Sequence, residues 1–261
     1  MRRDEPFLID IFAVEPSTIE SPEIVRGTPV AIVSEDVVTG GQTLLARLPA
    51  GWRGSEPADD GTLEVFVLEG ELNVDGRTLH AAGFASVPQS SGGAELESAP
   101  GAVALLFWSP TLPVDPGAGV ATRSAWDVPW EVTVLEGFPH GFMHKSLRLP
   151  DKSGLQAHGA AGGFIRLVLP APGWISPNQE RHPDCWEENI MLRGDMLMPG
   201  RGRIGPGMNL ANPDGHWHGP MATKGGALFL VHCDAPMGVD YRSYEPGPSE
   251  LHQYLDTAPW F

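Results

Sequence analysis

The sequence predicts an all-β protein built from two tandem domains. The chain has 261 residues, which is long enough for one large or two medium hydrophobic cores. Its 32 glycines and 26 prolines are spread along the chain rather than clustered, which is typical of short strands joined by turns. Helical periodicity is scarce, and the chain repeats itself once. These observations favour sandwiches or barrels over helical folds.

The repeat has a period of about 124 residues. Similar segments occur twice in the same order, such as EVFVLEGEL from Glu64 and EENIMLRGDM from Glu187. The matched positions are Trp52 and Trp174, Gly70 and Gly194, Pro88 and Pro213, and Pro110 and Pro236. Four matches in order at nearly one offset indicate a duplicated domain, with copies near residues 1–125 and 126–261.

Strands are expected in sequence through the first copy. Residues 64–70 predict a short strand that ends in a turn. Residues 71–74 then lead to the tight turn Asp75-Gly76, a pair typical of β-hairpins. The apolar run at 102–108 has the length of another strand.

In the second copy, a hairpin is expected to gather polar side chains. Residues two apart on a strand share a face, so Glu180 and His182 should point the same way. Residues 183–186 should reverse the chain and place Glu187 at the start of the next strand. A second hairpin should then bring His218 back toward the same face.

The end of the second copy predicts one strand and one helix. The apolar run at 227–233 is the counterpart of the last strand of the first copy. Residues 249–255 favour a short helix with Ser249 as its cap, and a disordered tail is the alternative.

His182, Glu187 and His218 form a candidate metal site. Two imidazoles and one carboxylate suit a divalent first-row metal that keeps positions open for a substrate. The alternative is that these side chains are ordinary surface or core residues. If the three converge, the protein has a catalytic or binding metal.

The spacing of these residues resembles the two sequence motifs of the cupin superfamily. Four residues separate His182 from Glu187, and six more precede Gly194. Four residues separate Pro213 from His218, and the segment PDGHWHGP is similar to the PxGxxHxP form of the second motif. With its repeat, the chain resembles a bicupin.

The resemblance implies two tandem double-stranded β-helix domains of the cupin or jelly-roll type, with few short helices and a metal in the barrel mouth. The sequence departs from the family pattern at Glu180, where the usual first motif has a histidine. Glu180 is therefore a fourth metal ligand, a catalytic group or an acceptor that orients a ligand imidazole.

The first copy is expected to be a degenerate, metal-free domain. In the repeat alignment, Ala58, Leu63 and Gly93 stand at the positions of His182, Glu187 and His218. Such residues cannot coordinate an ion, although Glu56 matches Glu180. Residues 1–125 should support the metal-binding domain at 126–261.

Two further histidines join Glu180 as candidate catalytic residues. His216 lies two positions before His218 on the same face and could replace it or bind a substrate, and a rim position is the alternative. His232 lies in an apolar strand and could act as an acid or base, and a hydrogen-bonded core histidine is the alternative. Cys185 could bind a metal as a thiolate or simply pack.

Composition excludes several classes of partner. The formal net charge of −16 would repel nucleic acid and anionic membrane surfaces. Acidic residues interrupt the N-terminal segment MRRDEPFLIDIF, so no signal peptide is expected, and no apolar run is long enough for a transmembrane helix. Two cysteines are too few for a secreted disulfide scaffold, which favours a cytoplasmic location.

The resemblance favours a metal-dependent enzyme of the Fe(II) dioxygenase type that acts on a small organic molecule. A non-redox isomerase, lyase or cyclase with Zn²⁺, Mn²⁺ or Ni²⁺ is one alternative, because cupins perform all of these reactions. A non-catalytic module that binds a small molecule is another. Either a monomer or a homodimer fits the sequence.

Overall fold

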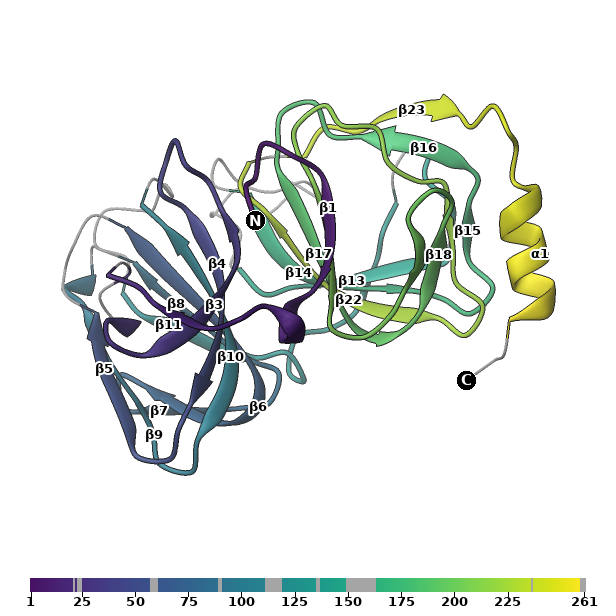
Figure 1. The fold of residues 1–261 in the computed structure, drawn as a ribbon. Coiled ribbons are helices and arrows are strands. Elements are labelled where there is room, and N and C mark those ends of the chain that lie inside the picture. Colours follow the sequence, from purple (N-terminus) through teal and green to yellow (C-terminus); the bar gives the residue numbers. More distant parts are fainter. Residues whose placement is uncertain are drawn as a thin grey trace. The chain divides into compact units, whose positions relative to one another are not determined.

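The chain folds into two compact units (Figure 1). The computed structural model describes residues 1–20, 22, 25–56, 61–88, 91–110, 119–134, 137–148, 163–235 and 237–258. The first unit consists of Met1–Arg3 and Ile11–Val128, and the second of Asp4–Asp10 and Pro129–Phe261. The division expected at residue 125 differs in one respect, because Asp4–Asp10 belongs to the second unit.

The first unit is built from antiparallel strands. They are β2 (Ser17–Thr18), β3 (Pro29–Glu35), β4 (Gln42–Leu48), β5 (Trp52–Glu56), β6 (Thr62–Val74), β7 (Arg77–His80), β8 (Gly83–Pro88), β9 (Ala94–Ser98), β10 (Ala102–Ser109) and β11 (Ala121–Ser124). The main sheet has the order β11-β8-β6-β10-β4-β3-β2, while β7 and β9 pair with β6, and β5 pairs with β9. A 3-10 helix at Ile11–Ala13 precedes them.

The second unit adds one strand from the N-terminus to those of residues 129–261. Its elements are β1 (Phe7–Asp10), β12 (Glu131–Val132), β13 (Phe142–Ser146), β14 (Phe164–Pro170), β15 (Ile175–Ser176), β16 (Asn178–Arg181), β17 (Glu187–Gly194), β18 (Met196–Met198), β19 (Gly202–Ile204), β20 (Met208–Asn212), β21 (Met221–Ala222), β22 (Ala227–Cys233), β23 (Asp240–Ser243) and α1 (Ser249–Thr257). One sheet has the order β1-β20-β17-β22-β14-β13-β12, and a second has the order β15-β21-β18-β19. The pair β16-β23 lies at one end of the two sheets (Figure 1).

The two units repeat the same strand order, as the sequence repeat predicts. The run β8-β6-β10-β4-β3-β2 of the first unit corresponds to β20-β17-β22-β14-β13-β12 of the second. The edge place beside β8 is taken by β11, and the edge place beside β20 is taken by β1. The strand at the N-terminus thus completes the second unit.

Two glycines of the repeat have a steric reason to be glycine. Gly70 and Gly194 both have positive φ, at 77° and 76°. A Cβ atom at Gly70 would lie 2.2 Å from the carbonyl oxygen of Gly101, and one at Gly194 would lie 2.2 Å from that of Gly226. No side chain fits at such a distance, so the match between these positions reflects the same close approach of two paired strands in both units.

The predicted elements agree with the structure, with two corrections. Strand β6 continues through Gly70, so the turn expected there is a bend within one long strand. The turn Asp75-Gly76 is present, with positive φ at both residues. Residues 249–257 form a helix rather than a tail, but its N-cap is Pro248 and no side chain caps it, so the prediction for Ser249 was wrong.

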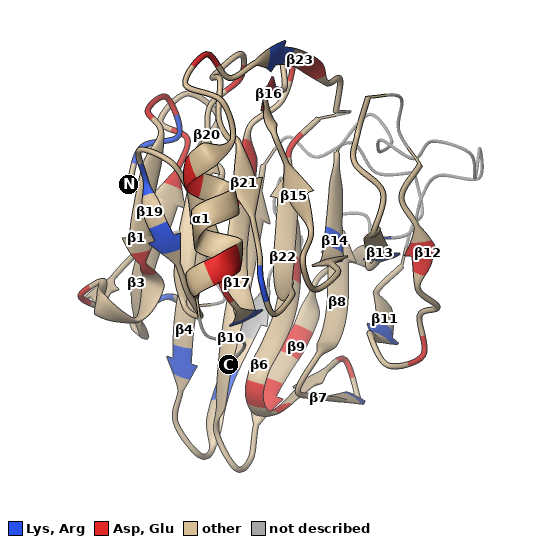
Figure 2. Cartoon of the chain, turned by 90° about the vertical axis from the view of Figure 1, so that its right-hand side faces the viewer, with Lys and Arg blue, Asp and Glu red and all other residues tan. Residues whose placement is uncertain are grey.

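The described part of the chain contains no helix of the length and hydropathy needed to cross a membrane. Acidic residues, shown in red in Figure 2, are spread over both units and outnumber the basic residues by 33 to 17. The absence of polyanionic partners stays a prediction that rests on this net charge.

Candidate metal centre

The second unit encloses a cavity of about 110 Å³ between its strands. Residues from both of its sheets line the cavity, and most of the lining is aromatic or aliphatic. The aromatic and sulfur-bearing part of the lining is Phe138, Phe142, Phe164, Trp174, Met196, Met221, Phe229 and Met237. Such an enclosed apolar space with a few polar groups is the usual form of a small-molecule site.

Four polar residues of the lining come from three separate segments of the second unit. Glu180 lies in β16, His182 follows that strand directly, and Glu187 opens β17. His218 lies in the segment between β20 and β21 and forms an isolated β-bridge with Glu180. The backbone of Glu180 exchanges both hydrogen bonds with His218, each 2.9 Å long, so this bridge holds the two segments side by side.

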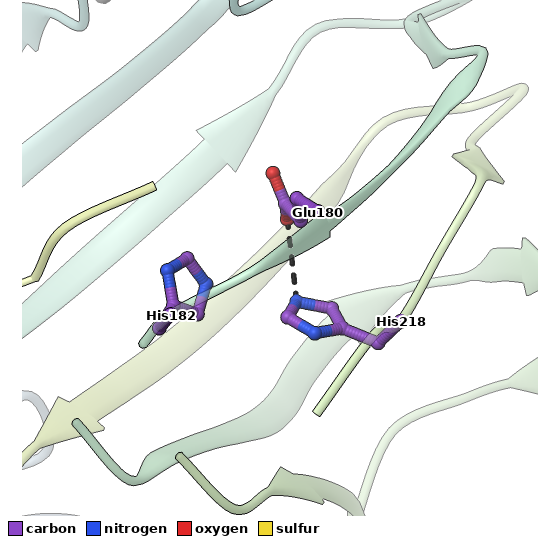
Figure 3. Close-up of side chains that lie close together, drawn as sticks. All are labelled: Glu180, His182 and His218. Atoms are coloured by element: carbon purple, nitrogen blue, oxygen red, sulfur yellow. Dashed lines mark ion pairs between the residues drawn. The ribbon is translucent and has the colours of Figure 1, made fainter. Parts of the chain in front are cut away.

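The side chains of Glu180, His182 and His218 converge (Figure 3), and that of Glu187 lies beside both imidazoles. The Nε2 atom of His182 lies 3.6 Å from Oε1 of Glu187. The Nε2 atom of His218 lies 3.4 Å from Oε1 of Glu180 and 3.5 Å from Oε2 of Glu187. Ligand atoms of Glu180, His182 and His218 all lie within 4.8 Å of one another. The structure therefore brings together all four residues for which the sequence predicts a role as metal ligands.

Backbone carbonyls orient both imidazole rings. The Nδ1 atom of His182 lies 3.0 Å from the carbonyl oxygen of Gly238, and Nδ1 of His218 lies 3.2 Å from that of His216. A carbonyl only accepts hydrogen bonds, so each Nδ1 carries the proton and donates it. In the neutral ring, each Nε2 then presents a lone pair to the carboxylates, which is the tautomer that a metal ligand needs.

The two Nε2 atoms are buried without a hydrogen-bond partner among the described residues. Both imidazoles are almost fully buried, with 4 % of each residue exposed. A buried polar atom without a partner is costly, and a native structure rarely contains one without a reason. A cation between the rings and the carboxylates would satisfy both atoms, so the donor set fits a divalent metal.

The pKa values of Glu180 and His218 are shifted in directions that reflect the close contact between the two side chains. Burial alone would raise the pKa of Glu180, but the close approach of His218 and the nearby His182 lower it below its ordinary value. Burial alone would lower the pKa of His218, but Glu180 and Glu187 raise it. The negative Glu180 carboxylate and a positive His218 imidazole stabilise each other. A bound cation would be stabilised by the carboxylates in the same way.

Glu187 and Glu188 serve opposite faces of β17. Oε2 of Glu187 accepts a hydrogen bond of 3.2 Å from Nδ2 of Asn212 beside the cluster. Glu188 instead accepts one of 3.0 Å from Nδ2 of Asn209, and its Oε2 lies 3.3 Å from Nδ1 of His232. His232 is therefore part of a buried polar network that does not line the cavity, and the structure does not support its prediction as a catalytic acid or base.

The other sequence candidates also lie outside the cavity lining. The backbone carbonyl of His216 orients His218, while the His216 side chain is half-buried and is not part of the lining. Cys185 packs in the hydrophobic core of the second unit.

In the first unit, an apolar side chain stands at the position of Glu187. Leu63 is paired with Trp108 just as Glu187 is paired with Cys233. Leu63 is fully buried, and a Cβ atom at Gly61 would lie 2.4 Å from the Trp108 ring. Ala58 and the Glu56 side chain lie outside the described residues, so the metal-free state of this unit stays a prediction.

Several cavity residues were not predicted from the sequence. Arg166, His144 and Tyr241 all contribute to the lining. Burial and the charge of Glu180 raise the pKa of Tyr241, so its hydroxyl keeps its proton. A signal for Arg166 was available, since it is the one charged residue in the apolar strand FIRLVLP.

No protein-family model and no curated protein sequence matches the chain. Solved structures do match. A candidate dioxygenase from Nostoc punctiforme has a TM-score of 0.69 and 17% identity, over 92% of this chain and 87% of that one. A candidate glyoxylate-induced protein from Pseudomonas aeruginosa has a TM-score of 0.64 and 15% identity, over 94% and 91%. The oxalate decarboxylase of Bacillus subtilis, a protein with Mn(II) centres, has a TM-score of 0.54 and 13% identity, over 97% and 81%.

At these identities the likeness concerns the fold. Each match spans nearly the whole chain, so it covers both units and not one cupin domain alone. The predicted resemblance is thereby confirmed: the chain has the bicupin fold, with two double-stranded β-helix units in one polypeptide.

Proposed function

We propose that the protein is a metal-dependent enzyme of the Fe(II) dioxygenase type that acts on a small organic molecule. His182, Glu187 and His218 would hold the ion, and Glu180 would be a fourth ligand. One observation carries this proposal: two buried Nε2 atoms face carboxylates at 3.4–3.6 Å, have no hydrogen-bond partner among the described residues, and belong to rings that backbone carbonyls orient.

The donor set is suited to several first-row ions. Imidazole suits Fe²⁺, Zn²⁺ and Ni²⁺, and carboxylate oxygens suit Mn²⁺, while two histidines and one carboxylate are typical of non-haem iron oxygenases. When bound, such an ion would activate O₂ or polarise a carbonyl or carboxylate of the substrate. The fold of the Nostoc punctiforme candidate dioxygenase agrees with this class.

The residues of this chain would prepare the cavity for the reaction. The aromatic and methionine lining would limit the access of bulk water, which would strengthen electrostatic interactions inside. Gly238 and His216 hold the ring orientations through their carbonyl oxygens. Asn212 donates to Glu187 and holds the carboxylate toward the two rings.

Metal analysis tests the site directly. Protein purified without a chelating tag should contain metal, and the His182→Ala variant should have lost it. His216→Ala is the matched control, because it removes a neighbouring imidazole that does not line the cavity. Equal metal contents in the wild type and His182→Ala would contradict the site, whatever the activity.

A second candidate function has its own support. Glu180 gives the cluster a second carboxylate, which suits Mn²⁺, and the structurally similar oxalate decarboxylase is a protein with Mn(II) centres. A lyase or isomerase reaction at a Lewis-acid ion would then replace oxygen chemistry. Oxygen uptake separates the two: iron-loaded protein that consumes O₂ on substrate addition supports the first, and turnover without O₂ supports the second. Metal bound without any turnover would favour a non-catalytic binding module.

A further inference from the structure

We infer that the substrate is a small carboxylate with an apolar body, and that Arg166 binds its carboxylate group. This inference rests on the proposal that the cavity is the substrate site. It concerns a residue of β14, which is separate in the chain from all four candidate ligands. It assigns to the cavity a chemical class of substrate.

The strand register places Arg166 beside the cluster. Arg166 is the cross-strand partner of Val231, and Val231 is the partner of Asn189. Asn189 lies two residues after Glu187 on the same face of β17, so Arg166 belongs to the row next to that of a candidate ligand. All of these residues line the cavity. A substrate that reaches the ion from this side therefore meets the guanidinium.

The surroundings of Arg166 favour recognition of an anion. It is the one lysine or arginine among the described residues of the lining, and its guanidinium lies 4.2 Å from the Phe164 ring centre. Burial lowers the pKa of Arg166, but an arginine side chain stays charged in proteins. The planar group can bind a carboxylate through two parallel hydrogen bonds.

Among the described acidic residues near Arg166, Glu131 is exposed, and Glu180 and Glu187 face the imidazoles. The Glu131 carboxylate acts on Arg166 through space, but its side chain is 65% exposed and it also pairs with His144 at 3.6 Å. Solvent screens a charge of this kind. The carboxylates of Glu180 and Glu187 face the imidazoles, where a divalent ion would offset both charges.

Two more cavity groups favour a ligand with acceptor oxygens. The Trp174 Nε1 and the Tyr241 hydroxyl are buried and have no hydrogen-bond partner among the described residues. The indole N–H can only donate, and the protonated hydroxyl can also donate. The repeat supplies a comparison: in the first unit the equivalent Trp52 donates to Oγ1 of Thr28 at 2.9 Å. The second unit has kept the tryptophan in its cavity wall without such a partner.

The test compares acids with neutral molecules of the same shape. Binding of 3-methylbutanoate and phenylacetate to the full chain is measured by calorimetry or ligand-observed NMR, beside 3-methylbutanamide and phenylacetamide. We expect the acids to bind on the order of tenfold to a hundredfold tighter than the amides, since a hydrogen bond to a charged group has that effect. Arg166→Met should abolish this preference, and Tyr241→Phe should weaken acid binding.

Controls separate this inference from the proposed metal function. Arg193→Met removes an exposed arginine of the same unit and should keep the preference for acids. If Arg166→Met folds poorly, Arg166→Lys serves as the second variant. It keeps the charge and should retain part of the preference for acids. Metal content should be unchanged in all Arg166 variants, so loss of metal in His182→Ala and loss of acid binding in Arg166→Met are independent results. Equal binding of acids and amides by the wild type, no binding of either acid, or an unchanged preference in a folded Arg166→Met would overturn the inference.

Discussion

Adjacent residues on β17 show how one strand separates chemistry from stability. Glu187 faces two imidazoles in the cavity, and Glu188 faces Asn209 and His232 on the other side of the sheet. Both carboxylates are buried, so burial alone does not mark the functional one. The difference comes from the two-residue period of a strand, which sends neighbours to opposite faces.

Isosteric substitution of these two glutamates should give opposite results. Glu187→Gln replaces a candidate ligand by a neutral amide, and we expect metal affinity to fall more than about tenfold, because even the loss of an outer partner of a ligand has such an effect. Glu188→Gln should keep its metal but lower the free energy of unfolding by about 1–3 kcal/mol, since it weakens charge-assisted hydrogen bonds. Metal analysis and denaturant unfolding of both variants measure this.

The assignment of the two faces would be wrong if Glu188→Gln lost metal while Glu187→Gln kept it. Circular dichroism of both variants excludes a general failure to fold as the cause of metal loss.

At this scale the sequence predicts the candidate metal ligands better than the other residues that line the cavity. The spacing of His182, Glu187 and His218 is a local pattern, so it can be read without coordinates. Arg166 and Tyr241 lie far from that motif in the chain and meet it only through strand pairing. His232 looked available because its apolar strand does not reveal which face each residue takes.

At the scale of elements, the close pairing of β17 with β22 depends on a glycine. Gly194 has a positive φ, and the carbonyl of Gly226 occupies the place where its side chain would be. Gly173 has the same φ of 76° but no atom within 4 Å of a Cβ position. Comparing substitutions at Gly194 and Gly173 therefore separates the cost of the left-handed backbone from the cost of a steric collision.

Gly194→Ala should therefore destabilise the protein more than Gly173→Ala. The left-handed conformation costs an alanine about 1–2 kcal/mol, which is all that Gly173→Ala should lose. Gly194→Ala should lose about 1–3 kcal/mol more, because the strands must move apart to fit the methyl group. Urea unfolding of both variants gives the difference, and equal losses would show that the close pairing can relax without cost.

The likeness of the two units could be predicted from the repeat, but the ends of their strands and the strands at the sheet edges could not. Strands β10 and β22 lie where the apolar runs predict them. The assignment of β1 to the second unit is a long-range pairing with β20, and no local pattern of residues 7–10 reveals it. The cap of α1 was mispredicted because Ser249 begins the helix, while Pro248 precedes it without a side-chain hydrogen bond.

At the scale of the whole molecule, each unit has its own hydrophobic core. The core of the first unit is mainly aliphatic with Trp52 and Trp108, and that of the second contains several methionines and aromatic rings. Only the second contains a cluster of candidate ligands among the described residues. A bound ion should thus stabilise one unit and leave the other unchanged.

Removal of metal by a chelator should then lower one thermal transition only. A ligand stabilises the state that binds it, so the transition of the second unit should move to lower temperature, while that of the first should not. Differential scanning calorimetry with and without EDTA measures both, and elemental analysis should give about one ion per chain, as one ligand cluster of this kind requires. The His182→Ala variant should be insensitive to EDTA, and a shift of both transitions in the wild type would contradict a single metal-binding unit.

The place of β1 has a consequence for synthesis on the ribosome. Phe7 is translated before residues 11–128 of the first unit, but its partner Ala211 is translated only after those residues and most of the second unit. The first unit can close around its own core while this short segment waits. The second unit can be completed only when the newly translated β20 meets the much earlier β1, so premature termination before β20 leaves β1 without its partner.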